Sequence, residues 1–218
     1  EKASVDAEVA RLSRLRSQHV ESHYRMRSQI RHLTDEIPRL ERRLESVRKD
    51  IASRHDTHGD AFVMQLDGQP LRDRGIAGEL LLRHAERMRG SRGERQVGHF
   101  AGFQVLVADN FMGGPEILLK GAATHTAKVG TTALGTIRSV EYVIQNLDET
   151  VANLEQQIGS TQKRLADLTV QSAQPFEYAE RLATLTQRQQ EIEDALDLTK
   201  NQASSQLDTR SSEETSGD

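Results

Sequence analysis

The sequence contains no cysteine, few aromatic residues and no long apolar run. The absence of cysteine excludes disulfides, thiolate catalysis and cysteine-ligated zinc. Aromatic residues make up 4% of the chain and hydrophobic residues 35%, which is little material for a large core and is typical of long helices. No apolar run approaches the roughly 18 residues that a membrane-spanning helix needs, and no signal peptide is recognisable. We therefore expect a cytoplasmic protein that does not bind membranes.

The motifs of common catalytic sites are also missing. The segment 98–103 is rich in glycine, but it lacks the lysine of a phosphate-binding loop and the GxGxxG spacing of a dinucleotide site. There is no HExxH sequence, no nucleophile elbow and no pair of carboxylates in a recognisable frame. We therefore predict that the chain is not an enzyme by itself and that it carries no cofactor, no metal and no catalytic residue.

Two segments, one near each end of the chain, carry a heptad repeat. An apolar residue recurs at alternating spacings of four and three, which makes a seam along one side of a helix, and such a seam needs a partner helix. The first repeat comprises Met26, Ile30, Leu33, Ile37, Leu40, Leu44, Val47 and Ile51. The second comprises Val140, Ile144, Leu147, Val151, Leu154, Ile158, Thr161, Leu165 and Leu168.

We interpret the two repeats as the arms of a long antiparallel coiled-coil hairpin. The first arm covers residues 1–55, and the second covers residues 137–201 with a break near Pro175. The predicted register places Ile51 opposite Val140, and Leu44 opposite Leu147. Periodicity alone leaves open an intermolecular coiled coil, and hence a homo-oligomer. Residues 202–218, rich in Ser, Thr, Asp and Glu, are predicted to be a disordered tail.

The net charge of −4 is distributed unevenly. Lys and Arg outnumber Asp and Glu in the first arm, and the reverse holds from residue 138 onward. Opposite charges on two arms suit pairing along the edges of a coiled-coil seam. A nucleic-acid-binding face on the basic first arm is the alternative interpretation. Because the chain starts at Glu1 in a polar, helix-compatible stretch, we interpret it as a fragment of a longer protein.

The middle segment, residues 56–136, has a different periodicity and is predicted to form a small α+β domain at the tip of the hairpin. Residues 75–88 have apolar positions at helical spacing and predict one amphipathic helix. Short segments with strand character, separated by glycine-containing turns, predict a mostly antiparallel sheet of about five strands. These segments are 61–66, 96–100, 103–108, 116–119 and 124–129.

A group of five arginines is the best candidate for a binding site. Arg83, Arg87, Arg89, Arg92 and Arg95 surround a Gly/Ser turn at the end of the predicted helix. Guanidinium groups bind phosphates bidentately, and a flexible turn lets them follow a nucleic-acid backbone. Glu86 and Glu94 dilute the positive charge, and no aromatic residue is interleaved for base stacking. An ordinary solvated loop is the alternative.

Two histidine-containing groups could bind a metal ion. His55, Asp56, His58 and Asp60 cluster where the first arm ends, and a hydrolase or nuclease that uses this cluster is one possible function. A polar connection is the simpler interpretation. His19 and His23 lie four residues apart on one helix face, and we interpret them as a polar interruption of the coiled-coil seam.

Several short glycine-centred motifs resemble a known family. They are Gly75-Ile76-Ala77-Gly78, Val97-Gly98-His99-Phe100-Ala101-Gly102-Phe103, Leu119-Lys120-Gly121, Gly135-Thr136-Ile137-Arg138-Ser139-Val140-Glu141 and Pro175-Phe176. Their order is similar to the C-terminal region of large plasmid and phage proteins that fuse an SNF2-like helicase to an N6-adenine DNA methyltransferase. His99 and His125 stand where that pattern has tyrosine.

The resemblance implies a role in DNA metabolism, with the helicase and methyltransferase sites upstream of this segment. The expected function is a non-catalytic accessory domain that positions DNA through its tip or joins other domains of the parent protein. The alternative is a protein-interaction or dimerisation scaffold with no nucleic-acid role.

Overall fold

The computed structural model describes residues 1–110 and 113–213, and it shows an α+β fold. The chain forms two compact units, which are described separately. Unit 1 contains residues 1–32 and the chain from residue 165 onward, and unit 2 contains residues 33–164. The long helix α1 (Lys2–Ser53) contributes to both units and continues across Pro38. None of the described helices has a stretch apolar and long enough to cross a membrane.

In unit 1, α1 packs antiparallel to α5 (Ala179–Glu213). Leu12 and Leu182 are buried, and ion pairs join Glu1 to Arg188 at 2.8 Å and Glu8 to Arg181 at 2.9 Å. The helical path is interrupted after Ser172 and resumes at Ala179, so the predicted break near Pro175 is present. α5 continues through residues 202–213, where a disordered tail was predicted, and residues 214–218 lie outside the described residues.

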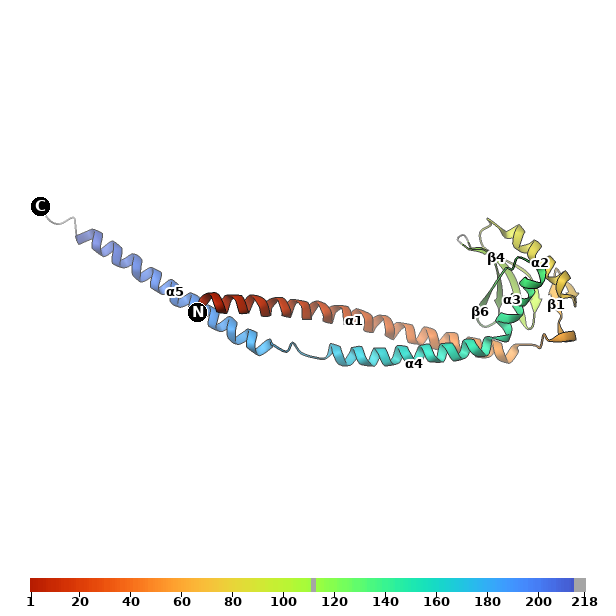
Figure 1. Cartoon of the computed structure of the whole chain (residues 1–218), viewed down its shortest axis with the longest axis horizontal. Helices are drawn as coiled ribbons and strands as arrows, with labels where there is room; N and C mark the ends of the chain where they lie inside the picture. Colours follow the sequence, from red (N-terminus) through yellow and green to blue (C-terminus); the bar gives the residue numbers. More distant parts are fainter. Residues whose placement is uncertain (111–112, 214–218) are drawn as a thin grey trace. The chain divides into compact units, whose positions relative to one another are not determined.

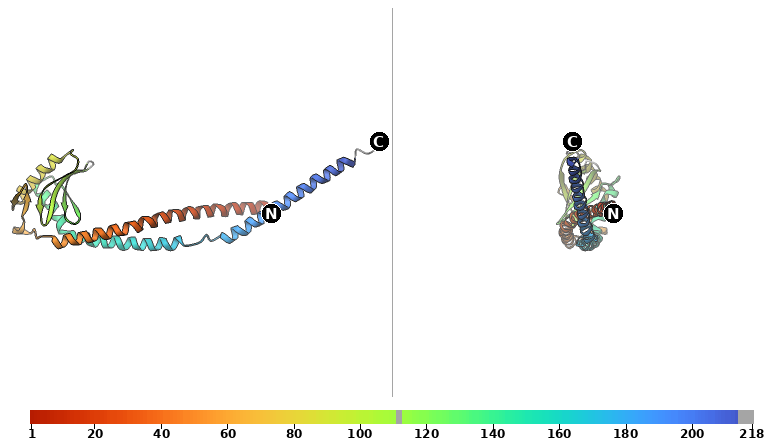
Figure 2. Two further views of the ribbon diagram at one scale, coloured as in Figure 1. Left: turned by 180° about the vertical axis from the view of Figure 1, so that it is seen from behind. Right: turned by 90° about the vertical axis from the view of Figure 1, so that its left-hand side faces the viewer.

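In unit 2, the C-terminal part of α1 packs antiparallel to α4 (Leu147–Ser172), and the two helices lie side by side in Figures 1 and 2. The apolar seam is formed by heptad residues of both helices. These are Leu40, Leu44 and Val47 from α1, and Leu147, Leu154 and Ile158 from α4. The packing of these helices within one chain confirms the predicted hairpin for this segment.

The predicted register of the hairpin is wrong. Arg48 forms an ion pair with Glu155 at 2.6 Å, whereas the predicted register places Val143 opposite Arg48. A seven-residue repeat looks the same after a shift by whole heptads, so the sequence pattern alone does not fix the register.

The globular part of unit 2 is built on an antiparallel sheet with six strands, one more than predicted. Its strand order is β2-β1-β3-β4-β5-β6, and each strand pairs with its neighbours in an antiparallel register. The strands are β1 (Met64–Leu66), β2 (Gln69–Leu71), β3 (Glu94–Phe100), β4 (Phe103–Asn110), β5 (Gly114–Lys120) and β6 (Thr124–Lys128). The additional strand, β2, contains Pro70 and lies at the edge of the sheet, where a missing donor is tolerated.

Two helices, α2 (Arg74–Met88) and α3 (Ala133–Gln145), lie on one face of this sheet (Figure 1). Asp73 caps α2 by accepting from the amide of Ile76, and Thr132 caps α3 by accepting from that of Gly135. The 3₁₀ turn η1 (Gly59–Ala61) precedes β1. The core between the helices and the sheet includes Leu81, Phe103, Val105, Ile117 and Ile137.

Two predictions are wrong at helix α3. The second arm was predicted to be one uninterrupted helix, and the sheet was predicted to carry only one helix. The backbone leaves the helical path at Asn146, whose amide and side chain both donate to the carbonyl of Tyr142. Val140 and Ile144 therefore face the core of the globular part, and the coiled coil begins only at Leu147. The sequence carries a signal for this break, because Asn146 is followed by Asp148 and Glu149, residues that favour a new helix start.

Candidate functional site

The five predicted arginines lie together where α2 ends and the chain turns into β3. Arg83 and Arg87 belong to the last turns of α2, Arg89 follows the helix, Arg92 lies in the turn and Arg95 begins β3. All five side chains are exposed. Arg87 and Arg89 lie at the C-terminus of α2, where the helix dipole favours positive charge. Stabilising this end of the helix is their simplest structural role.

The turn that carries Arg92 is held by hydrogen bonds from its backbone amides to a side chain of the sheet and to the end of α2. Gly90 and Gly93 have φ of +74° and +95°, a conformation that favours glycine. The amide of Gly90 donates to the Asp109 carboxylate of β4 at 2.6 Å, and the amide of Ser91 donates to the carbonyl of Met88 at 2.8 Å. The backbone of the turn is thus fixed while its arginine side chains project into solvent.

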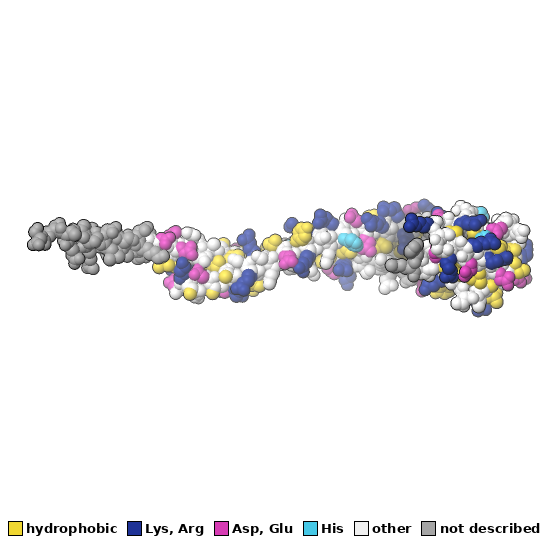
Figure 3. All heavy atoms as spheres, turned by 90° about the horizontal axis from the view of Figure 1, so that it is seen from above, with side chains coloured by type: hydrophobic (Ala, Val, Ile, Leu, Met, Phe, Trp, Pro, Cys, Tyr) yellow, Lys and Arg dark blue, Asp and Glu magenta, His cyan; other side chains and the backbone are white. Residues whose placement is uncertain are grey.

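The acidic residues near this turn do not neutralise most of its arginines. Glu86 pairs with Arg89 at 3.2 Å, and Glu94 pairs with Lys120 of β5 at 2.9 Å. Within the described part of the chain, the side chains of Arg83, Arg87, Arg92 and Arg95 make no hydrogen bond or ion pair. On the side of the molecule that Figure 3 draws, Lys and Arg side chains are interspersed with acidic ones. The group is therefore a small cluster of available cations and not a continuous basic surface.

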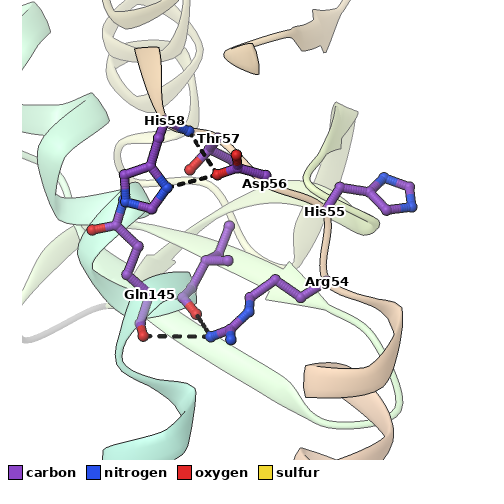
Figure 4. Close-up of a pocket in the computed structure, with 7 residues that line it drawn as sticks. Arg54, His55, Asp56, Thr57, His58 and Gln145 are labelled. Atoms are coloured by element: carbon purple, nitrogen blue, oxygen red, sulfur yellow. Dashed lines mark hydrogen bonds and ion pairs between the residues drawn. The ribbon is translucent and has the colours of Figure 1, made fainter. Parts of the chain in front are cut away.

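A second candidate is a pocket of about 470 Å³ where α1 leads into the globular part. Figure 4 shows the guanidinium of Arg54 directed at the end of α3, where it donates to the carbonyls of Ile144 and Gln145. Nδ1 of His58 lies 2.6 Å from Oδ1 of Asp56, which also accepts from the amide of His58. These two hydrogen bonds, the backbone one foremost, lower the pKa of Asp56. Asp56 and His58 therefore form a local turn in which both side chains are exposed.

The structure does not assemble the metal cluster considered for this segment. His55 points away from the Asp56–His58 pair in Figure 4, and Asp60 does not line the pocket. Among the described residues, no three His, Asp or Glu side chains are grouped so that they could hold a metal ion. A hydrolytic role for the cluster therefore finds no support in the geometry.

A buried polar network, not predicted from the sequence, joins α1 to the turn between β5 and β6. Asp50 is 1% exposed and accepts from the amides of Ala122 and Ala123 at 2.6 and 2.9 Å, and from Nε2 of His125 at 2.8 Å. The His125 ring meets Phe103 edge to face. One feature of the sequence could have indicated this network: His125 occupies an inward position in strand 124–128, whose residues alternate between the two faces of the sheet. The network is fully formed within the chain, which indicates a structural role.

In unit 1, His19 and His23 face the segment between α4 and α5. Their ring centroids are 4.0 Å apart, and the His19 ring lies 5.5 Å from that of Phe176. Burial, followed by the nearby His19 and Arg27, lowers the pKa of His23. The two histidines thus take part in packing at the helix break, as expected for a polar interruption of the seam.

No family model, curated protein or solved structure matches the chain.

Proposed function

We propose that this chain is a non-catalytic accessory domain of a larger DNA-processing protein, and that its arginine turn contacts DNA phosphates. The turn comprises Arg83, Arg87, Arg89, Arg92 and Arg95. The observation that carries the proposal is that four of the five guanidinium groups are exposed and have no acidic partner in the described chain. Such groups can bind phosphate without breaking an existing ion pair, and each contact releases counterions from the DNA.

The association with a helicase–methyltransferase parent rests on the glycine-centred motifs alone. In this fold, the Gly75–Gly78 motif forms the first turn of α2, and the motif that begins at Gly135 lies in α3. The parent's enzymatic sites would lie outside this chain. The accessory domain would then help to position DNA or to join other parts of the parent.

The test is binding to double- and single-stranded DNA over a salt series. In the test variant, Arg87, Arg92 and Arg95 are changed to glutamate. The matched control changes Arg39, Arg42 and Arg43, exposed arginines of α1, to glutamate, so that the net charge changes equally. We expect the turn variant to lose most of its affinity, and the slope of log K against log salt to decrease by roughly 0.9 for each lost phosphate contact.

Equal losses in both variants would indicate a nonspecific charge effect and would count against the turn. A loss confined to the α1 variant would move the contact to the basic face of the first arm. No binding at low salt in the wild type would remove the DNA proposal altogether.

The second candidate function is a protein-interaction scaffold with no nucleic-acid role. The observation that favours it is a set of exposed apolar side chains on the outer side of α2 and α3, namely Ile76, Leu134 and Tyr142.

A further inference from the structure

The backbone of the turn between α2 and β3, residues 90–93, depends on a single side chain. The amide of Gly90 donates to Oδ2 of Asp109 in β4 at 2.6 Å. Among the described residues, no other side chain forms a hydrogen bond with the backbone of this turn. Gly90 and Gly93 adopt positive φ, and glycine has more conformational freedom than any other residue. Without the contact to Asp109, the turn would therefore have several conformations available.

The segments on both sides of the turn are fixed by secondary structure. Arg83 and Arg87 belong to α2, and Arg95 belongs to β3, so the positions of these three residues do not depend on the turn. Arg92 lies inside the turn, between the two glycines, and its guanidinium is placed by the conformation of the turn. Among the arginines whose side chains have no partner in the described chain, Arg92 is therefore the one that Asp109 can position.

The carboxylate of Asp109 lies in an environment that does not favour a negative charge for its own sake. Its Oδ2 accepts from the amide of Gly90, but its Oδ1 is buried and accepts no hydrogen bond within the described chain. A buried oxygen without a partner lowers the stability of the fold. A carboxylate close to the arginine turn also opposes the binding of phosphate there. The hydrogen bond to the turn is thus the benefit that accounts for Asp109.

We propose that Asp109 is a positioning residue of the DNA contact, and that it holds the turn in the conformation in which Arg92 reaches a phosphate. This inference rests on the proposed function, because it assigns Asp109 a role in DNA binding. A turn that is ordered before DNA arrives does not have to lose conformational freedom on binding, and the affinity is higher for that reason. This gain exceeds the loss of affinity that the negative charge causes.

The hydrogen bond and the charge of Asp109 have opposite effects on DNA binding. If Asp109 acted only through its charge, Asp109→Ala would strengthen binding, because it removes a negative charge beside the site. If Asp109 acts by holding the turn, Asp109→Ala weakens binding although the protein becomes more positive. Asp109→Asn removes the same charge but keeps a side-chain oxygen that can accept from the amide of Gly90. The comparison of these two variants therefore isolates the hydrogen bond.

The experiment measures the Kd of the full chain for double-stranded DNA at one fixed salt concentration. We expect Asp109→Ala to bind about threefold to tenfold more weakly than the wild type, the usual cost of ordering a mobile segment on binding. Asp109→Asn should bind at least as tightly as the wild type. Gly90→Pro removes the donor and leaves every charge in place, and it should weaken binding as Asp109→Ala does. Asp60→Ala, which removes an exposed carboxylate of η1, is the matched control and should change Kd by less than about twofold.

Two further backgrounds test whether Asp109 acts through Arg92. In the Arg92→Ala background, the difference between Asp109→Asn and Asp109→Ala should fall to less than about twofold, because the side chain that the turn positions is absent. In the Arg83→Ala background, which removes an arginine outside the turn, the full difference should remain. A purely structural role would give the same difference in both backgrounds and would overturn the proposal. Hydrogen exchange of the Gly90 amide should be slow in the wild type and in Asp109→Asn, and faster in Asp109→Ala.

The outcomes separate this inference from the proposed function. If the wild type does not bind DNA, both fail. If the wild type binds and the glutamate variant of the turn loses affinity, the proposed function stands. Equal affinities of Asp109→Asn and Asp109→Ala, or tighter binding by Asp109→Ala than by the wild type, would then overturn the positioning role alone. Should Asp109→Ala fail to fold, Gly90→Pro decides in its place, and an unchanged affinity of that variant would overturn the proposal.

Discussion

Asp50, in the last turn of α1, lies 2.8 Å from Nε2 of His125 in β6, and both side chains are buried. The same carboxylate accepts two backbone amides from the turn between β5 and β6. One buried side chain therefore ties the end of the coiled coil to the sheet. This arrangement ties the orientation of the hairpin end to that of the strands.

Asp50→Ala should lower the free energy of unfolding of unit 2 by about 3 kcal/mol, because it leaves two amides and an imidazole buried without a partner. Urea denaturation would measure the change. Asp35→Ala, which removes an exposed carboxylate of α1, is the matched control and should stay within about 0.5 kcal/mol of the wild type. Similar stabilities of the two variants would show that the network is energetically unimportant.

Gly121→Ala should destabilise unit 2 through the same carboxylate. A Cβ atom on Gly121 would overlap the Asp50 side chain and approach Phe103 to 3.0 Å. We expect a cost of about 1–3 kcal/mol, typical of overpacking. In the Asp50→Ala background the cost should be clearly smaller, since the larger overlap is removed. Simple additivity in this double-mutant cycle would contradict the close approach.

Arg74→Lys should destabilise the contact between α2 and α3. The guanidinium donates to Glu141, to the carbonyl of Thr57 at 2.8 Å and to that of Gly59 at 3.2 Å, and it lies 4.4 Å from the centre of the Phe62 ring. An ammonium group cannot reproduce this planar set of donors. We expect a loss of about 1–2 kcal/mol by thermal or urea unfolding, with Arg72→Lys as the control for an exposed arginine without ion pairs in the described chain.

The stability of unit 1 should decrease at mildly acidic pH. The lowered pKa of His23 means that folding favours the neutral imidazole. Its contribution is present above the ordinary histidine pKa of 6.5 and is lost as the pH falls through the lowered value. Hydrogen exchange of residues 15–27 between pH 7.5 and 5 would detect the change. His23→Gln should weaken the pH dependence, whereas His99→Gln, in unit 2, should leave it unchanged.

The shifted register can be checked by cross-linking. Cysteines that replace Arg48 and Glu155 should be joined within one chain by a short bismaleimide, because the original side chains meet at 2.6 Å. The pair Arg48→Cys with Val143→Cys, which the sequence-based register places opposite each other, should react poorly. Products found only between chains would show that the arms pair between molecules in solution.

The sequence predicted the repeating elements well and the junctions poorly. Heptads with few interruptions predicted α1 and the hairpin, and alternation with glycine turns predicted five of the six strands, because each pattern repeats over many residues. The break at Asn146 was missed since Val140 and Ile144 continue the heptad spacing although they belong to α3, a helix of the globular part. The repeat likewise gave no information on which register is adopted.

For the candidate sites, the sequence identified the arginine turn because its residues are adjacent in the chain. It did not identify the Asp50–His125 contact, whose partners are 75 positions apart. The partner of Glu94 was also unpredictable, since Lys120 reaches Glu94 only through the strand order β3-β4-β5. Proximity that depends on topology cannot be read from local spacing.

The contacts of Arg54 indicate how this chain could be re-engineered. It is the first residue after α1, and it binds the last carbonyls of α3 and, at 3.1 Å, Asp148 in the first turn of α4. The two ends of the globular part are thus held next to each other at the top of the coiled coil. A segment whose ends coincide can be removed or exchanged without separating the helices that carry it. The sheet with α2 and α3 can therefore be removed as one piece. A short turn that joins residue 54 directly to residue 147 should give a helical hairpin without the globular part.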